Sequence, residues 1–255
     1  MSISEYKIEA RDISKAFVVN KDYIEVLRNI SLGVRPNEFL VILGPGQSGK
    51  TTLINCMSGI MAPDSGDIFL NGEIVTEAGP ARGVVFQQYA LFPWKSVLEN
   101  VAFGLTIRGV DKKERREVAQ HYIDLVGLQG FEKAYPHHLS GGMRQRVSIA
   151  RAYASDPEVL FMDEPFSALD AQTRYAMEQD ILRITEQEKK TIIFITNNVE
   201  EAIYLGDRII LLTSLPGRIK RVFPVEMVKP RDYTDARFLD LRLAISEDTE
   251  LILDA

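Results

Sequence analysis

The sequence is poor in residues that build disulfide and metal frameworks, with one cysteine, Cys56, and three histidines among 255 residues. A single cysteine excludes a disulfide framework and a cysteine-rich zinc site. Long apolar runs are also lacking, because the longest, such as Phe39–Leu43, have four or five residues. A membrane-spanning helix needs about 20. No basic segment followed by an apolar core opens the chain, so we expect no secretory signal and a cytoplasmic, reducing location.

An excess of positive charge is absent as well, since 30 lysines and arginines face 36 aspartates and glutamates and leave a net charge of −6. This balance gives no reason to expect a nucleic-acid partner. The 17 glycines and 11 prolines exclude collagen and low-complexity classes. The length suits one large α/β domain, or one domain with an insertion.

Short apolar runs between turn signals predict strands near the start of the chain, at residues 6–8, 16–19, 24–27 and 30–34. Asn37 falls in a turn where we expect a positive φ, which asparagine tolerates better than most residues. Residues 63–86 return to short strands, with Asn71-Gly72 as a hairpin turn.

Alternating strand and helix patterns in the rest of the chain predict the α/β class with a largely parallel core. Continuous apolar runs, typical of buried strands, occur at 39–43, 159–162, 191–195 and 209–212. Helical patterns occur at 52–59, 97–105, 112–126 and 171–188. We interpret the helical block at 95–155 as an insertion into the core, and residues 226–255 show no clear pattern.

Gly44-x-x-x-x-Gly49-Lys50-Thr51 matches a phosphate-binding loop, with the expected strand before it and helix after it. Its glycines let backbone amides turn toward phosphates, and the helix N-terminus adds a positive end. We expect Lys50 to reach the β- and γ-phosphates of a nucleotide and the Thr51 hydroxyl to hold Mg²⁺.

Asp163 and Glu164 follow the apolar run 159–162 and therefore emerge at the carboxyl end of a buried strand, where ligands bind in α/β sheets. An apolar run that ends in two acids is common, but beside a phosphate loop it indicates an ATPase site. We expect Asp163 to hold Mg²⁺ through water and Glu164 to act as the general base.

Residues 139–146, LSGGMRQR, place Ser140-Gly141-Gly142 at the start of a helix. Free amides, a hydroxyl and the absence of Cβ atoms make a second anion cradle there. Because one nucleotide needs only one such cradle, the second cradle suggests that it binds a nucleotide held by another chain. The alternative interpretation is a helix-capping turn.

With these three motifs in this order, residues 5–225 resemble the nucleotide-binding subunit of an ABC transporter. The resemblance implies a P-loop NTPase (RecA-like) core with an N-terminal antiparallel β-subdomain and an inserted α-helical subdomain. The implied ATPase domain is 1–225, with core and β-subdomain in 1–87 and 156–225 and the helical subdomain at about 88–155. Residues 226–255 form a tail.

The resemblance also implies individual roles. Phe17 matches the aromatic residue that stacks on adenine, unless it is a core residue. Gln87 matches the glutamine that senses Mg²⁺ and the γ-phosphate, unless it is a surface amide. Asp170 matches the end of a loop that crosses the dimer interface. The implied nucleotide contacts are Phe17, Gly44, Pro45, Gly46, Gln47, Ser48, Gly49, Lys50, Thr51, Thr52, Ser140, Gly141, Gly142, Gln145 and Asp170.

The stretch from Gln87 to Val101 matches the groove where the helix of an integral membrane permease docks. The alternative interpretation is that its aromatic residues belong to the hydrophobic core. Among them, Trp94 is the one that we expect to contact the partner. The other implied partners are a second ATPase subunit and, indirectly, a substrate-binding protein, at the cytoplasmic face of the membrane.

Two positions depart from the family pattern. Asn197 stands where the family has a switch histidine that contacts the γ-phosphate, and asparagine cannot titrate or carry charge. Gln47 stands where glycine is common, so its backbone conformation is costlier. We therefore expect catalytic roles for Glu164, Lys50, Gln87 and Asn197, with hydrolysis slowed at Asn197 unless Glu164 suffices.

The motifs around Trp94, the 139–146 segment and Leu215-Pro216-Gly217-Arg218 resemble the importer branch for nitrate, sulfonates and taurine. The expected function is ATP binding and hydrolysis, with Mg²⁺, that energises import of such a small solute. The alternatives are a degenerate ATP-binding partner in a heterodimer and a non-transport ABC ATPase.

Overall fold

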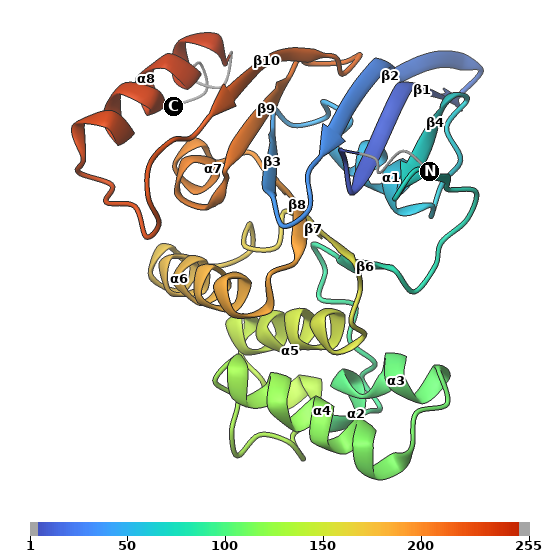
Figure 1. Ribbon diagram of the computed structural model, residues 1–255, viewed down its shortest axis with the longest axis vertical. Coiled ribbons are helices and arrows are strands. Elements are labelled where there is room, and N and C mark those ends of the chain that lie inside the picture. The colour runs from blue at the N-terminus through green and yellow to red at the C-terminus, as the bar shows by residue number, and fades with distance from the viewer. Residues whose placement is uncertain (1–4, 250–255) are drawn as a thin grey trace. The chain divides into compact units, whose positions relative to one another are not determined.

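The computed structural model describes residues 5–249 and forms two compact units. One unit combines the described residues of Met1–Gly79 and Lys190–Ala255, and the other is Pro80–Lys189. Within the described range, we find no helix with the length and apolarity to cross a membrane. Figure 1 labels the elements of both units.

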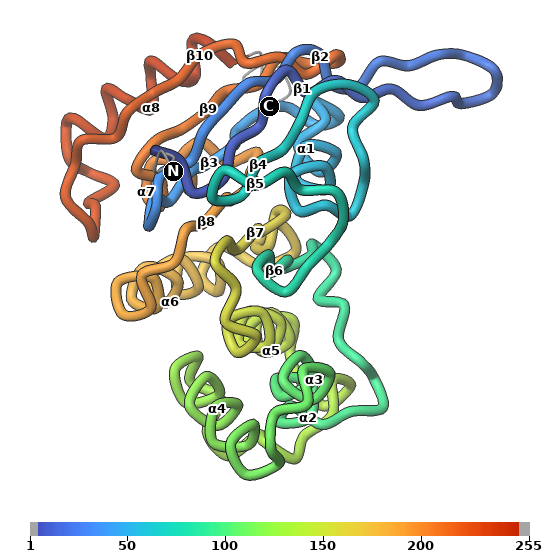
Figure 2. Tube along the Cα trace, turned by 45° about the vertical axis from the view of Figure 1, so that its right-hand side comes forward, coloured from blue at the N-terminus to red at the C-terminus, as the bar shows by residue number. Residues whose placement is uncertain are grey.

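The first unit opens with an antiparallel sheet in the order β2-β1-β4-β5. Its strands are β1 (Ile8–Val19), β2 (Asp22–Val34), β4 (Ser65–Leu70) and β5 (Glu73–Ile74). The predicted separate strands at 24–27 and 30–34 are wrong, because they form one strand. Asn29 takes a φ of 51°, and the chain bulges there without breaking the pairing. The hairpin between β1 and β2 extends beyond the sheet (Figure 2).

The same unit contains four strands in the order β10-β9-β3-β8. These are β3 (Phe39–Leu43), β8 (Thr191–Thr196), β9 (Arg208–Leu212) and β10 (Ile219–Pro224). β3 is parallel to β8 and β9, whereas β10 is antiparallel to β9. Every residue of β3 and β8 is buried, which confirms the prediction from their continuous apolar runs.

The described part of the first unit also contains three helices, α1 (Lys50–Ser58), α7 (Val199–Leu205) and α8 (Ala236–Asp248). α8 was not predicted, because it lies in the segment 226–255, where the sequence shows no clear pattern. Its fully buried residues are Phe238 and Ile245, seven positions apart. So narrow a buried stripe leaves little apolar periodicity in the sequence. The turns at Asn37 and Asn71-Gly72 have the predicted positive φ, from 52° to 82°.

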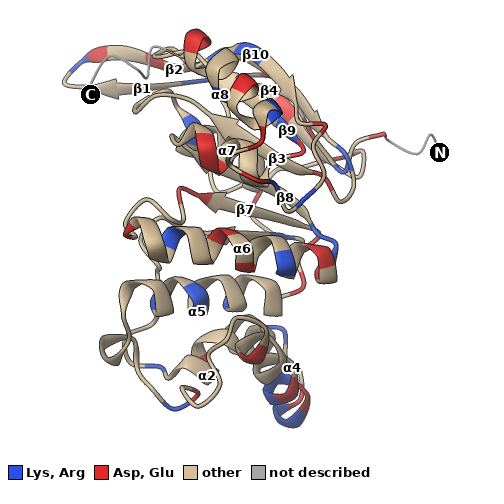
Figure 3. Ribbon diagram, turned by 90° about the vertical axis from the view of Figure 1, so that its left-hand side faces the viewer, with Lys and Arg blue, Asp and Glu red and all other residues tan. Residues whose placement is uncertain are grey.

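The second unit pairs two parallel strands, β6 (Arg82–Val85) and β7 (Val159–Asp163), with a group of helices. The helices are α2 (Val97–Val101), α3 (Phe103–Ile107), α4 (Lys112–Leu125), the 3₁₀ turn Pro136–His138, α5 (Gly141–Ala154) and α6 (Ala171–Glu188). α5 and α6 lie side by side, joined by an ion pair of 2.6 Å between Arg146 and Asp180 (Figure 1). Charged residues mark the outer side of α4 (Figure 3).

The helix predicted at 97–105 is divided at Ala102 into α2 and α3. The hydrogen bonds from Ala102 N to Leu98 O and from Thr106 N to Ala102 O continue across the division. The break is therefore a local irregularity in one helical segment.

Candidate nucleotide site

The parallel strands of the first unit bring three loops to one edge. Leu43, the last residue of β3, pairs with Thr196 of β8 and with Leu211 of β9. The residues that follow these strands are the phosphate loop (residues 44–51), the switch position Asn197 and the loop 213–218. They therefore leave the sheet at its carboxyl edge, where ligands bind in this class of fold.

The phosphate loop has a backbone that two residues hold in the left-handed region. Gly49 has a φ of 84°, and Gln47, the residue that replaces a common glycine, has a φ of 64°. For a non-glycine residue this conformation costs roughly 1–2 kcal/mol. The expected backbone cost at Gln47 is thus present in the structure. A Cβ added to Gly46 would meet nothing within 4 Å, so space for a ligand lies open beside that residue.

Lys50 begins α1 and is buried, with an exposed fraction of 5%. Its ammonium donates hydrogen bonds of 2.8 Å to the carbonyl oxygens of Gly44 and Pro45, so the loop wraps around the lysine head. Ser48 Oγ is buried with no hydrogen-bond partner within the described residues. A buried cation and an unsatisfied hydroxyl inside a loop of turned amides fit a polyphosphate ligand.

The loop 213–218 packs against the phosphate loop. A Cβ added to Gly217 would lie 2.2 Å from the backbone oxygen of Ser48. The backbone of Gly217 is fixed on its other side by β2, with bonds of 2.8 Å to Val26 O and 3.0 Å from Arg28 N. Only glycine allows this approach, and no motif in the sequence indicated this contact.

The other predicted residues of the first unit lie as follows. Phe17 is half-buried in β1 opposite Ile24, with the Lys15 ammonium 5.8 Å from its ring centroid, and so is not a core residue. Thr51 is exposed at the start of α1, and Thr52 is half-buried. Asn197 is exposed beyond the end of β8.

The second unit gathers the predicted acids and Gln87 at one strand edge. Val85 pairs with Met162, so Gln87 and the residues after β7 leave the two strands at corresponding points. Gln87 Nε2 donates to Ser167 Oγ at 3.3 Å, and Ser167 Oγ donates to Glu164 O at 2.9 Å. The structure thus connects Gln87 to the backbone of Glu164 through Ser167, a link that the motifs did not reveal.

Asp163 is buried with an exposed fraction of 8%, and Glu164 is half-buried with a φ of 42°. The turn at Glu164 ends β7 and directs the chain into the loop that contains Ser167. Carboxylate and amide oxygens are ligands that Mg²⁺ prefers, so the side chains of Asp163 and Gln87, which follow paired strands, fit the predicted ion by their chemistry.

Ser140 caps α5, and its hydroxyl accepts a hydrogen bond of 3.3 Å from Met143 N. The predicted helix start is confirmed. Added Cβ atoms would lie 3.1 Å from Tyr89 Oη at Gly141 and 2.8 Å from Thr173 Cγ2 at Gly142, so both positions require close approach.

Gln145 and Asp170, the remaining predicted nucleotide contacts, both belong to helices of the second unit. Gln145 is fully buried in α5, and its amide oxygen and nitrogen have no hydrogen-bond partner within the described residues. Asp170 caps α6 by accepting bonds of 3.0 Å from Thr173 N and 2.7 Å from Thr173 Oγ1. These bonds hold the pKa of the Asp170 carboxyl below its usual range.

The first unit holds a loop of turned amides around a buried lysine, and the second unit holds two acids at the end of a parallel strand. These two features define a nucleotide-hydrolysing protein of the P-loop class. The sequence profile described as "ABC transporter" matches residues 27–167, more than half of the chain. The chain belongs to the ABC transporter family and is an ABC transporter ATPase. The resemblance to this family that the three motifs indicated is thereby confirmed.

Several relatives support this assignment. The chain is 49% identical over 239 residues to the ABC transporter ATP-binding protein MJ0412 of Methanocaldococcus jannaschii, covering 94% of this chain and 90% of that one. It is 47% identical over 204 residues to a taurine import ATP-binding protein of Roseobacter denitrificans, covering 80% and 76%. It is 44% identical over 220 residues to a nitrate import ATP-binding protein of Synechocystis, covering 86% and 83%.

Among solved structures, a dimer of the ATP-binding cassette MJ0796 bound to ADP and phosphate matches with a TM-score of 0.76 at 29% identity. The match covers 87% of this chain and 100% of that one. The fold is therefore the ABC cassette fold, which confirms the predicted mixed sheet with an antiparallel β-subdomain and a helical region.

Proposed function

We propose that this chain is the ATP-hydrolysing subunit of an importer for a small solute such as nitrate, a sulfonate or taurine. The phosphate loop that encloses Lys50 carries the proposal of ATP binding. The proposal of import and of the solute class is supported by the names of the taurine and nitrate relatives. A membrane permease and a substrate-binding protein would complete the importer.

The proposed active form is a head-to-tail pair of ATPase subunits. Each ATP would lie between the phosphate loop and acids of one chain and Ser140, Gly141 and Gly142 of the other. Two observations support this arrangement: the chain presents a second cradle at the start of α5, and the MJ0796 cassette is dimeric. Phe17 would stack on adenine, and Asp170 would lie in the loop that crosses the interface.

Within the proposed site, Lys50 would neutralise the β- and γ-phosphates, and Glu164 would accept the proton of the attacking water. Thr51, Gln87 and Asp163 offer the hydroxyl, amide and carboxylate oxygens that would hold Mg²⁺. Bound Mg²⁺ would supply charge neutralisation along the phosphates. The hydrogen bonds from Gln87 through Ser167 to the Glu164 backbone would keep the base aligned with the residue that senses the ion.

Asn197 makes the proposed hydrolysis slow. Asparagine can donate one hydrogen bond to a phosphate but cannot add positive charge. Loss of one charge-stabilising donor typically reduces the rate roughly 10²–10³-fold. The same substitution favours a second candidate, a subunit that hydrolyses efficiently only beside a relative with an intact switch histidine.

The permease would dock on the second unit at residues 87–101. Aromatic residues of this segment and of α3 form a cluster, in which the ring centroid of Phe92 lies 4.3 Å from that of Phe103 and 5.8 Å from that of Trp94. Arg151 of α5 fixes this segment by donating hydrogen bonds of 2.6 Å to Ala90 O and 3.2 Å to Tyr89 O. Trp94 stays 71% exposed, as expected for a residue that contacts a partner.

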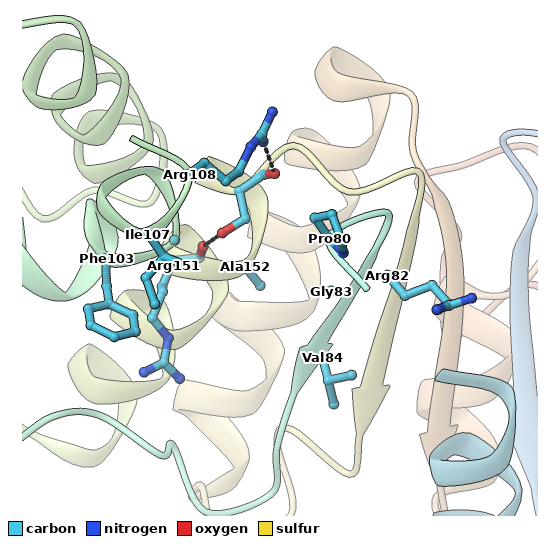
Figure 4. A pocket seen from close by; sticks show the side chains of 11 residues that line it. Pro80, Arg82, Gly83, Val84, Phe103, Ile107, Arg108, Arg151 and Ala152 are labelled. Carbon is cyan, nitrogen blue, oxygen red and sulfur yellow. Dashed lines mark hydrogen bonds between the residues drawn. The ribbon is translucent and has the colours of Figure 1, made fainter. Parts of the chain in front are cut away.

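A cavity of about 400 Å³ extends this surface between β6 and the ends of α3 and α5. Figure 4 shows Phe103, Ile107 and Arg151 on one wall, across from Pro80 and Val84. Ile107 is 71% exposed, and Arg108 lies at the rim, where it donates to Ser155 O at 2.9 Å. The occupant that fits an apolar floor with a cationic rim is a short apolar permease helix with an acidic residue.

The test of ATP hydrolysis uses the Glu164→Gln variant. We expect it to bind ATP as tightly as the native chain, to lose turnover by at least about 10²-fold, and to elute as a dimer in size-exclusion chromatography with MgATP. Unchanged turnover in this variant would refute Glu164 as the base.

The test of the switch position compares the native chain with Asn197→His. If Asn197 limits hydrolysis, the histidine variant gains turnover at unchanged ATP affinity. Equal rates would show that Glu164 suffices for hydrolysis.

The solute is tested by uptake into vesicles that contain the chain with its permease, where nitrate, a sulfonate and taurine are compared at equal concentration.

A further inference from the structure

The described part of the tail, residues 226–249, contacts α7, the short helix that follows the switch position. The sequence indicated no role for this tail. α7 begins at Val199, two residues after Asn197. Figures 1 and 3 both show α8 next to α7, and the two helices belong to the same unit. Arg231 and Tyr233 contact the end of α7, and Arg242 contacts its start.

Arg231 holds the end of α7. It is buried, with an exposed fraction of 6%, and donates to Ile203 O and Gly206 O at 2.6 Å and to Tyr204 O at 3.1 Å. The last carbonyl groups of a helix have no partner within the helix, so a buried guanidinium there satisfies them and favours the helix dipole. Burial lowers the pKa of Arg231 to about 10, so the side chain remains charged at neutral pH.

The tail makes a second contact with the end of α7 and one contact with its start. Tyr233 stacks on Tyr204 with centroids 4.8 Å apart and planes inclined by 9°. Arg242 of α8 donates to Glu200 Oε1 at 2.6 Å, in the first turn of α7. A cavity of about 660 Å³ lies beside this ion pair, between α8 and residues Asn198 and Val199.

The first turn of α7 is directly connected to the switch position. Asn198 caps α7 by accepting a bond of 3.1 Å from Glu201 N, and its own N donates to Thr196 Oγ1 at 2.9 Å. Asn197 therefore lies between a buried strand and a helix whose two ends are both fixed. A shift of α7 moves the backbone that carries the Asn197 side chain.

We propose that the tail is a positioning element for hydrolysis: Arg231 and Arg242 fix α7 and thereby hold Asn197 in its orientation toward the terminal phosphate. Neither arginine contacts the nucleotide. The proposal rests on the role of Asn197 in hydrolysis given under the proposed function. It assigns to residues 226–249 a part in turnover and no part in ATP affinity.

The experiment compares Arg242→Ala with Arg237→Ala, a matched control on α8 whose arginine pairs only locally, with Asp235 at 2.8 Å. We expect Arg242→Ala to lower kcat about tenfold, because small displacements of a catalytic group cost that much, with KM and the Kd for ATP unchanged. The control keeps native kcat. Arg231→Lys provides a second variant, compared at equal folded fraction from its melting curve.

A double-mutant cycle with Asn197→Ala completes the test. If the tail acts through the switch, Arg242→Ala has no further effect once Asn197 is removed. Additive losses, or native kcat in Arg242→Ala, would overturn the role of the tail while leaving the proposed function intact. Native kcat in Asn197→Ala would instead refute the role of Asn197 itself, and the tail proposal with it.

Discussion

Tyr89 Oη lies 3.1 Å from the position that a Cβ on Gly141 would occupy. The ring of Tyr89 also faces the guanidinium of Arg144, at 5.2 Å from its centroid. The proposed docking loop and the start of α5 therefore touch within one unit. A partner that displaces Tyr89 would therefore change the contacts of Gly141, the residue next to Ser140 in the second cradle.

Gly141→Asp is expected to abolish ATP hydrolysis and leave ATP binding by the single chain within about twofold. The new carboxylate meets Tyr89 and adds negative charge where the partner's nucleotide would bind, and repulsion in such a site costs several kcal/mol. ATPase assays and equilibrium binding measure the two effects. The control is Gly130→Ala, where φ is 86° and an added Cβ meets nothing within 4 Å, so that it introduces backbone strain without a contact. Native turnover in Gly141→Asp would contradict the head-to-tail pair.

Gly217→Ala is expected to weaken ATP binding. Its Cβ would lie 2.2 Å from Ser48 O, and overpacking of this kind costs typically about 1–3 kcal/mol. We expect the Kd for ATP to rise about tenfold, which corresponds to about 1.4 kcal/mol. Gly66→Ala, which crowds Arg11 O at 2.3 Å in the antiparallel sheet, is the control that lowers the melting temperature without changing the Kd. Equal Kd values in both variants would show that Gly217 does not support the phosphate loop.

Asn100→Leu is expected to disrupt permease docking more than ATP hydrolysis. Asn100 is fully buried, accepts a bond of 2.9 Å from Phe92 N and donates to the carbonyls of Phe92, Lys95 and Ser96. Leucine leaves these groups without partners, at about 1–3 kcal/mol for each buried one. Co-purification with the permease should fall as it does in Trp94→Ala, while the isolated chain retains its ATPase rate. Native co-purification in both variants would place the docking surface elsewhere.

The Cys56 thiol is expected to resist modification in the folded protein. Its residue is 1% exposed, and burial raises the pKa of the thiol to about 11. The thiolate is the reactive form, so a raised pKa lowers its fraction at pH 8 by about 10²-fold. Reaction with a thiol-specific disulfide reagent should be slow in buffer and fast in guanidinium. Rapid reaction in the native state would show that α1 opens readily.

Local pattern was sufficient for the parts of the site that depend on neighbours in sequence. The apolar run Phe39–Leu43 and the glycine spacing after it predicted a buried strand and a phosphate loop, and the structure has both. Ser140 was likewise recognisable as a helix start, because a cap acts within three residues.

Contacts between distant segments were not predictable in this way. Arg231 binds carbonyls 25 to 28 positions before it, and nothing in its own neighbourhood marks it as buried. The link from Gln87 to Ser167 spans 80 positions and depends on the pairing of β6 with β7. Gln145 was assigned by motif position alone, and the motif does not reveal that this residue is fully buried.

The carbonyls that Arg231 satisfies set a limit on how far this chain can be shortened. A cassette trimmed after residue 225, where the recognisable family resemblance ends, would lose the guanidinium and leave the end of α7 without partners. A truncation, graft or tag on this ATPase therefore has to keep Arg231, because its guanidinium supplies the partners of the last carbonyl groups of α7.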